Sequence, residues 1–492
     1  MKGLLTTLRA LPSASRGGFM FTKFTAFRLG SVAFLLLFVL SSMNASPLFG
    51  HFRPYKSGVA FESSIAVGDV NGDGKPDLLT AGYFSEEGGA GEVGVVLATG
   101  KGKFGAFATY PTGGSFPSAI ALGDVNGDGR LDVVVSNYEN IGVLLGNGDG
   151  TFQAPHKFGT GGGNAIVLAD VNRDGKLDLV YGACTVLLGN GDGTFQAPQY
   201  FGTGGGNAIA AADINGDGKL DIITAGDAIY VLLGNGDGTF QSAQGYPSGG
   251  NWPNSIGVAD VNGDGKPDLV VANFIASNVG VLLGNGDGTF QPVQTYDSGG
   301  SQASAIVVED LNGDGKPDLA VTNQYTGTDD NSVVGVLLGN GDGTFQAAQT
   351  FSIGRVGGWA LAVGNLTGSS MPDLVVAGCK AIRGCVEGMF LVLPNTTKGF
   401  VTATALSSSL NPSNYGQAVT FTAKVSSAGP PPTGKVEFLD GTTRIGTVAL
   451  SGGVATLTKS KLAVGTHLLT AQYLGDAANA KSTSPVLNQV VQ

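Results

Sequence analysis

The stretch Asp-Val-Asn-Gly-Asp-Gly-Lys-Pro-Asp-Leu occupies residues 69–78 and recurs unchanged at residues 260–269. Its underlying pattern, Asp-x-Asn-x-Asp-Gly-x-x-Asp, occurs six times, beginning at Asp69, Asp124, Asp170, Asp213, Asp260 and Asp310. A seventh copy begins at Asn365 and keeps only its last carboxylate, Asp373. Self-similarity at spacings of 43 to 55 residues indicates a repeat architecture.

Each copy lies in the same local context. An alternating apolar run such as Ser118–Val125 precedes it, and a run rich in β-branched residues such as Leu131–Ser136 follows it. A second apolar run then ends in Gly-Asn-Gly-Asp-Gly-Thr-Phe, which is typical of a tight hairpin turn. Each unit is therefore expected to contain four strands.

Four-stranded units repeated seven times predict an all-β fold whose main domain, residues 46–400, is a seven-bladed β-propeller. A solenoid is the alternative, although its repeats are usually shorter and its ends need caps. A ring must also hide its edge strands. An additional strand-like segment around Phe49–Lys56 is expected to join blade 7 as its outer strand and close the ring.

The Asp-rich loop has the composition of a calcium site. Ca²⁺ takes six to eight oxygen ligands, and this loop offers oxygen side chains at positions 1, 3, 5 and 9 and a carbonyl at position 7. Position 6 is Gly, which permits the sharp turn. The flanking segments are strands and position 12 is not Glu, so the loop is not the helical calcium motif.

About six calcium ions are predicted. The expected ligands, with the position-7 residue contributing only its carbonyl, are Asp69, Asn71, Asp73, Lys75, Asp77; Asp124, Asn126, Asp128, Arg130, Asp132; Asp170, Asn172, Asp174, Lys176, Asp178; Asp213, Asn215, Asp217, Lys219, Asp221; Asp260, Asn262, Asp264, Lys266, Asp268; Asp310, Asn312, Asp314, Lys316 and Asp318.

The alternative is that Asp-Gly and Asn-Gly simply form turns. Turn formation does not require three like charges to converge six times, whereas a bound cation does. The blade-7 copy carries Asn365, Thr367 and Ser369 at the first three ligand positions, so no ion is expected there. The aspartates of the Gly-Asn-Gly-Asp-Gly turns, such as Asp149, are interpreted as turn chemistry.

These motifs resemble the FG-GAP, or VCBS, repeats of bacterial surface proteins and of the integrin α-chain propeller. The resemblance covers roughly residues 47–400. It implies a seven-bladed propeller with calcium loops joining strands 1 and 2 of each blade on one face. Integrins imply adhesion, but no residues of their ligand sites are matched here.

The Asp repeat stops after Phe400, and residues 401–492 are rich in Thr, Ser and Val. Alternating runs such as Ala418–Ser426 and His467–Tyr473 predict an Ig-like β-sandwich. The strings at 411–421 and 432–438 resemble bacterial Ig-like domain repeats. Such a domain is commonly a spacer or an adhesive module.

The N-terminal segment, residues 1–45, has the layout of a secretory signal: five basic residues and no acid, then the apolar run Leu29–Leu40, then small residues ending at Ala45. An uncleaved anchor is the alternative, but the apolar run is shorter than the ~20 residues that span a bilayer. We therefore expect a protein that is secreted or held at the cell surface of a bacterial envelope, with no membrane span after cleavage.

The net negative charge limits the kinds of partner that this protein is expected to bind. The net charge of −11 becomes −16 once the basic signal is removed, which disfavours nucleic acid. No nucleophile elbow or His-rich zinc spacing is present, so binding is expected rather than catalysis. A structural spacer and a polysaccharide-acting enzyme are the alternatives.

The expected partner is an unknown extracellular glycan or protein. The face opposite the calcium loops carries Phe61, Phe116 and Trp252 in loops that enter strand 1, and Trp359 in the matching loop of blade 7. These aromatics are predicted to form a ligand platform, or alternatively to plug the central channel as ordinary packing.

Overall fold

The computed structural model describes residues 48–492 except 84–88, 160–161, 204–205, 326–330, 370, 381–384, 386, 398–401, 428–430 and 477–478. Every regular element in these residues is a strand, so the predicted all-β class is confirmed. Among the same residues no helix is long and apolar enough to cross a membrane. The predicted signal segment, residues 1–45, lies outside the described residues.

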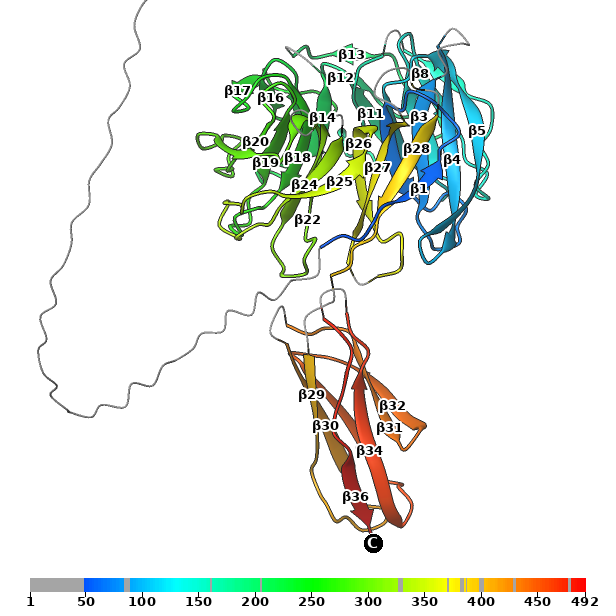
Figure 1. Cartoon of the computed structure of the whole chain (residues 1–492), viewed down its shortest axis with the longest axis vertical. Coiled ribbons are helices and arrows are strands. Elements are labelled where there is room, and N and C mark those ends of the chain that lie inside the picture. Colours follow the sequence, from blue (N-terminus) through cyan, green and yellow to red (C-terminus); the bar gives the residue numbers. More distant parts are fainter. Residues whose placement is uncertain are drawn as a thin grey trace, which may run out of the picture. The chain divides into compact units, whose positions relative to one another are not determined.

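Seven antiparallel four-stranded sheets are found between Arg53 and Leu393 in the described residues (Figure 1). Numbered in chain order, sheet 1 contains β2 (Ser64–Gly68), β3 (Asp77–Tyr83), β4 (Ala90–Gly100) and β5 (Lys103–Ser115); sheet 2 contains β6 (Ala119–Gly123), β7 (Asp132–Ser136), β8 (Ile141–Leu144) and β9 (His156–Phe158); and sheet 3 contains β10 (Ile166–Ala169), β11 (Asp178–Tyr181), β12 (Thr185–Leu187) and β13 (Gln199–Tyr200).

Sheets 4 to 6 repeat the same order. Sheet 4 contains β14 (Ala208–Ala212), β15 (Asp221–Ala225), β16 (Ile229–Leu232) and β17 (Gln244–Tyr246); sheet 5 contains β18 (Pro253–Ala259), β19 (Asp268–Asn273), β20 (Asn278–Leu282) and β21 (Gln294–Asp297); and sheet 6 contains β22 (Ser301–Glu309), β23 (Asp318–Tyr325), β24 (Ser332–Leu337) and β25 (Gln349–Gly354).

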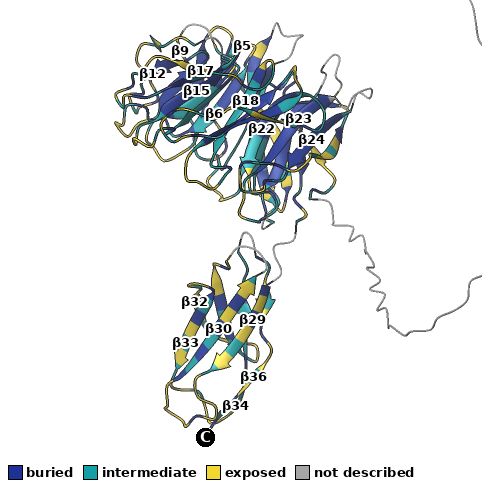
Figure 2. Cartoon of the chain, turned by 90° about the vertical axis from the view of Figure 1, so that its left-hand side faces the viewer, coloured by how far each residue is buried: buried dark blue, intermediate teal, exposed yellow. Residues whose placement is uncertain are grey.

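The second and third strands of these sheets are buried on both faces (Figure 2). The reason is that each sheet packs between two others. One hydrophobic cluster, for example, joins Leu79 and Val95 of sheet 1 to Val133 and Leu144 of sheet 2. Strands covered on both sides need continuous Val, Ile and Leu, which explains the apolar runs in the sequence.

Sheet 7 combines the two ends of this region, with the order β1 (Arg53–Lys56), β28 (Gly388–Leu393), β27 (Asp373–Lys380) and β26 (Val356–Gly364). In the register of β1 and β28, Arg53 pairs with Val392. The first strand of each sheet packs against the first strand of the next, and β26 packs against β2, so the cycle of sheets closes. The predicted outer strand around Phe49–Lys56 is confirmed.

The C-terminal residues form two further sheets. One contains β29 (Thr402–Ser408), β30 (Val419–Ser427) and β33 (Val454–Lys459); the other contains β31 (Lys435–Asp440), β32 (Thr443–Ala449), β34 (Gly465–Tyr473), β35 (Ser482–Thr483) and β36 (Leu487–Val491). The two sheets share one core, in which Phe421 of the first meets Phe438 and Tyr473 of the second.

Candidate functional site

The six Asp-rich loops connect the first and second strands of sheets 1 to 6, and their own backbone shapes them. In sheet 1, Asp69 accepts hydrogen bonds from the amides of Asp73 at 3.1 Å and Gly74 at 2.7 Å. Asn71 accepts from the same Asp73 amide at 3.0 Å. Gly74 has a φ of +79°, which side chains rarely adopt. The loop therefore gathers its oxygen side chains on its inner side.

The last aspartate of the loop, at position 9, behaves differently because it is fully buried. In sheet 2, Asp132 accepts hydrogen bonds from the amide of Val125 at 3.0 Å and from the amide of Gly146 at 2.8 Å. The first bond holds its own loop and the second holds the end of the third strand. Position 9 thus ties the loop to the neighbouring hairpin of the same sheet.

The pKa values of the position-9 carboxylates also depend on the other acids of their loops. In sheet 6, the pKa of Asp318 is raised to about 7, chiefly by burial and to a lesser extent by the charges of Asp314 and Asp310, against two backbone hydrogen bonds that lower it. In five sheets burial likewise raises the pKa of the equivalent residue, namely Asp77, Asp132, Asp178, Asp221 and Asp268.

The fit of these loops to calcium is good at positions 1, 3 and 5 and less direct at position 9. Among the described residues, no three His, Cys, Asp or Glu side chains are gathered as a ready metal cluster. Positions 1 and 9 both turn their carboxylate oxygens to backbone amides, as Asp69 and Asp132 show, and position 9 is in addition fully buried. Each carboxylate oxygen has two lone pairs, so an oxygen that accepts one N–H bond can still bind a cation.

The aspartates of the Gly-Asn-Gly-Asp-Gly turns are used locally. Asp149 accepts hydrogen bonds from the amide of Thr151 at 3.0 Å and from its hydroxyl at 2.6 Å. The same pair recurs in four further turns, at Asp192, Asp237, Asp287 and Asp342. These bonds are those of turn chemistry, as predicted.

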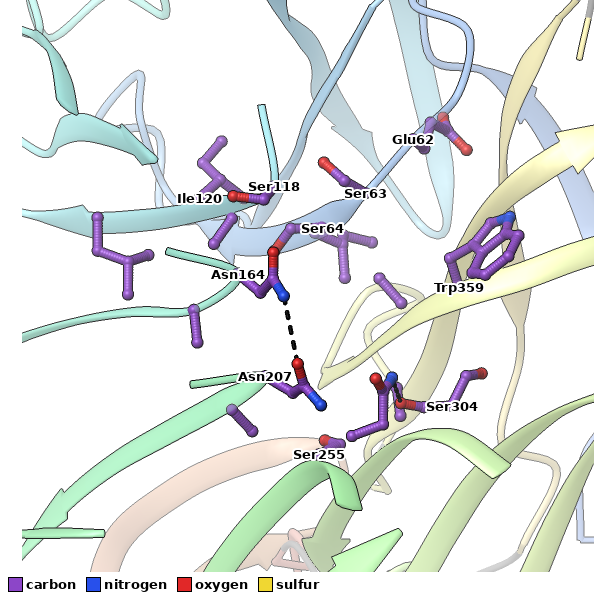
Figure 3. Close-up of a pocket in the computed structure, with 18 of the residues that line it drawn as sticks. Glu62, Ser63, Ser64, Ser118, Ile120, Asn164, Asn207, Ser255, Ser304 and Trp359 are labelled. Carbon is purple, nitrogen blue, oxygen red and sulfur yellow. Dashed lines mark hydrogen bonds between the residues drawn. The ribbon is translucent and has the colours of Figure 1, made fainter. Parts of the chain in front are cut away.

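A cavity of about 620 Å³ is formed where the first strands of the sheets begin, and every one of the seven sheets contributes to its lining. Figure 3 shows Asn164 and Asn207 on one side, with Trp359 and Glu62 on the other. Since the first strands form a closed cycle, this axial cavity is their common meeting point.

In sheets 1 to 6, the residue six positions before the first loop residue supplies a polar side chain, and together these side chains form a ring around the cavity. Each of its members donates a hydrogen bond into the next sheet: Ser63 to Pro117 O, Ser118 to Gly163 O, Asn164 to Asn207 Oδ1, Asn207 to Pro253 O, Asn254 to Ser304 O and Ser304 to Gly358 O. The sequence analysis missed this ring, although aligning the repeats on the Asp loops would have revealed it.

Trp359 occupies the ring position in sheet 7. It lies within β26, not in a loop as expected, and remains 47% exposed. Of the other predicted platform residues, Phe61 also lines the cavity, whereas Phe116 and Trp252 do not. Phe116 and Trp252 are 48% and 57% exposed, so neither is a buried plug.

Phe61, Phe116 and Trp252 share an unusual backbone conformation, with φ values of +43°, +47° and +61°. Gly357 stands at the equivalent position of sheet 7. Left-handed backbone costs a non-Gly residue roughly 1–2 kcal/mol. Phe61 is stacked on Tyr83, with ring centroids 5.1 Å apart, and Tyr83 contacts Phe116 edge-on. At these three positions an aromatic residue adopts a backbone conformation that glycine would adopt without strain, so each aromatic residue costs conformational energy.

Glu62 is the acidic residue that lines the cavity. It is 2% exposed, and neither carboxylate oxygen has a hydrogen-bonding partner of good geometry. Burial raises its pKa to about 8, although Ser57 and the backbone near Met389 and Gly378 partly oppose the shift. Burial thus favours the neutral form of Glu62 below about pH 8, at the junction of sheets 1 and 7.

A disulfide joins Cys379 of β27 to Cys385, and the amide of Phe61 donates to Cys385 Sγ at 3.1 Å. The bridge therefore lies beside the cavity, on the sheet 7 side. The remaining cysteine, Cys184, is buried and free.

The site and the sheets together define a class: an all-β repeat protein of propeller-like fold with an acidic loop in each repeat. The model of the FG-GAP-like repeat matches residues 69–135, 124–181, 181–224, 213–271, 260–321 and 310–376. The chain therefore belongs to the FG-GAP-like repeat family. Residues 406–492 match the bacterial Ig-like domain, group 3. No curated protein matches the chain.

Several solved structures are similar to this chain. A lectin of Agrocybe aegerita, described as recognising non-reducing terminal N-acetylglucosamine, is 24% identical over 61% of this chain and 81% of its own, with a TM-score of 0.41. The extracellular domain of a putative one-component system from B. thetaiotaomicron is 10% identical over 90% of this chain and 57% of its own, with a TM-score of 0.40. A Lactobacillus plantarum protein is 14% identical over 61% and 86%, with a TM-score of 0.43.

Proposed function

We propose that this chain is an exported, calcium-binding propeller of seven blades, followed by an Ig-like sandwich, that acts as a binding module for an extracellular glycan or protein. The observation that most directly supports this proposal is the position of Trp359. It replaces the one ring residue that would otherwise bond into the next sheet, and it stays 47% exposed beside a cavity of about 620 Å³.

Physical chemistry favours a ligand over packing as the reason for this tryptophan. A large aromatic side chain gains most when it is buried, and exposed aromatics beside a cavity commonly anchor partners. The ring amides of Asn164, Asn207 and Asn254 retain donor or acceptor capacity beyond the bonds they make between sheets, which number one each for Asn164 and Asn254 and two for Asn207. An aromatic face beside free amide groups suits a sugar ring or a polar loop of a protein.

Binding is proposed rather than catalysis because, among the residues that the structure describes, the lining of the cavity includes one carboxyl group, that of Glu62. Hydrolysis of glycosidic bonds generally uses two carboxyl groups that flank the bond. A spacer role is the second candidate, and the six bonds between sheets favour it, because they commit the ring to holding the sheets together.

The test is a screen of the exported form, in calcium, against a panel of glycans and purified extracellular proteins. For a ligand that binds, Trp359→Ser, which installs the residue type of sheets 1, 2 and 6, should weaken affinity by about 2 kcal/mol or more. Trp252→Ala serves as the comparison outside the cavity. The absence of any ligand would favour the spacer, and release of reducing ends from a polysaccharide would favour an enzyme.

A further inference from the structure

The turn between β4 and β5 departs from its counterparts in charge. In sheets 2 to 6 the turn reads Gly-Asn-Gly-Asp-Gly-Thr-Phe, whereas residues 98–104 read Ala-Thr-Gly-Lys-Gly-Lys-Phe. Lys101 therefore stands where five sheets have aspartate, and Lys103 stands where they have threonine. Two lysines replace an Asp–Thr pair that is held together by hydrogen bonds in the other turns.

The sheet 7 loop that contacts this turn has lost acidic residues, just as the turn has gained basic ones. The amide of Gly102 donates to Leu366 O at 3.0 Å, just as the amide of Gly150 donates to Val70 O at 3.1 Å in the next junction. The two contacts are therefore structurally equivalent. At the sheet 1 and sheet 7 junction, however, the loop offers Asn365 and Thr367 where the others offer acidic or amide ligands.

Like charges also meet within sheet 1. In sheet 2, the Arg130 side chain lies across Gly148 and, after the Thr151 hydrogen bonds, is a further cause of the lowered pKa of Asp149. Lys75 lies across Gly100 in the same way, but the next turn residue is Lys101. An opposite-charge neighbour has become a like-charge neighbour, and within the described residues only Lys75 of this pair has a carboxylate partner, Asp73.

The charges border a cavity of about 810 Å³, which we call the seam cleft; its lining includes Lys75, Lys101, Lys103 and Asn365. The Arg53 guanidinium lies against Gly102 at its edge. Lys75 pairs with Asp73 at 2.7 Å, but within the described residues Lys101, Lys103 and Arg53 form no ion pair. This concentration of positive charge stands out in a chain with 27 basic and 38 acidic residues.

We infer that the seam cleft binds an oxyanion, a sulfate, phosphate or carboxylate group, either as a free ion or as part of an acidic polymer. Ammonium groups and a guanidinium provide charge-assisted hydrogen bonds to such oxygens. The site is separate from the axial cavity. It borders the calcium loop of sheet 1, in which Lys75 supplies only a backbone carbonyl, but it is formed by charged side chains that are not predicted calcium ligands, so it adds a second class of ligand to the molecule.

The experiment measures sulfate binding by calorimetry and dextran sulfate binding on a surface, in calcium, with neutral dextran as the blank. The test variant Lys101→Asp/Lys103→Thr restores the residues of the other turns. The matched control, Lys424→Asp/Lys435→Thr, makes the same change of charge at exposed residues of β30 and β31.

The wild type should bind, and the test variant should bind at least about tenfold more weakly, while the control is unchanged and both variants melt like the wild type. Sulfate binding with this sensitivity supports a free-ion site, and binding of the polymer alone with the same sensitivity supports an acidic polymer. Equal losses in both variants, or no binding of either probe by the wild type, would overturn the inference.

Discussion

The loop of sheet 5 and the loop of sheet 7 occupy equivalent places in their sheets. Position 9 is the only ligand position at which both loops have a carboxylate, Asp268 in sheet 5 and Asp373 in sheet 7. Asp268 accepts from the amides of Val261 at 2.9 Å and Gly284 at 2.7 Å, and Asp373 accepts from the amides of Leu366 at 2.9 Å and Asn395 at 2.7 Å. The loop of sheet 5 adds acids at positions 1 and 5, and the loop of sheet 7 does not.

The difference separates two roles that the sequence motif combines. Position 9 is retained where the other acids are lost, because both hairpins depend on its backbone hydrogen bonds. Positions 1, 3 and 5 are retained only together, as expected of a shared ligand set. Four experiments test these roles and the structure around the loops, in order of decreasing expected effect.

The largest effect is expected from chelation, which acts on six loops and spares the seventh. Each ion that binds only the folded state adds about 2.7 kcal/mol when free calcium is a hundredfold above Kd. Removing it should lower Tm by at least about 10 °C, and calcium but not magnesium should restore it. Scanning calorimetry measures this shift, and an unchanged melting curve would eliminate the proposed calcium sites.

The second experiment compares Asp268→Ala with Asp373→Ala. In chelator, both should lose about 3 kcal/mol of unfolding free energy, because Asp268→Ala leaves two backbone amides without an acceptor and Asp373→Ala leaves three. In calcium, Asp268→Ala should lose more and bind one ion fewer, whereas Asp373→Ala keeps the full ion count. Chemical unfolding and metal analysis give both quantities. A neutral Asp373→Ala would show that position 9 serves the cation alone.

The third experiment uses Glu62→Gln to test the junction of sheets 7 and 1, where Trp359 interrupts the ring of hydrogen bonds. The folded pKa of about 8 lies above the unfolded value of 4.5, so the folded state binds the additional proton. Wild-type stability should therefore fall as pH rises from about 5 to 8, by up to 1.4 kcal/mol per unit. Glu62→Gln should flatten this slope and be about 2 kcal/mol more stable at pH 8.

Chemical unfolding of both proteins at pH 5.5 and pH 8 decides the third experiment. Ser57→Ala is the control, since it removes a neighbouring hydroxyl without changing the titrating group. Parallel stability profiles for the wild type and Glu62→Gln would mean that Glu62 is ionised and stabilised in the fold.

The smallest effect is expected for a turn aspartate. Asp342→Ala removes an acceptor of the Thr344 amide and hydroxyl on an exposed turn, so it should cost less than about 1 kcal/mol. The ion count should not change. Loss of an ion in metal analysis of this variant would move the turn aspartates from turn chemistry into the calcium site.

The repeat, the four strands of each unit and the closing strand at Phe49–Lys56 could all be predicted, because turn residues and apolar alternation are local properties. The two oxygens of Asp132 could not be assigned, since the amide of Gly146 reaches that carboxylate only after the third strand has folded back. The acceptors of the polar ring lie in the neighbouring sheet, so no local pattern marks them.

Trp359 illustrates the remaining limit. The sequence analysis grouped it with Trp252, but it stands six residues before its loop and Trp252 stands eight residues before its own. This difference places Trp359 inside β26 and Trp252 just before β18. Only an alignment of the repeats on the Asp loops reveals which of the two faces the cavity.

The pairing of β1 with β28 has a consequence for the order of events during folding. Arg53 is made early and its partner Val392 late, so the last sheet stays incomplete until almost the whole repeat region has emerged. Such distant pairing is paid for in loop entropy and slows folding. Fragments that lack β1 would expose the unpaired edge of β28, a template for association with another chain. Sheets 1 to 6 can form as they are synthesised, but sheet 7 forms only once both ends have met.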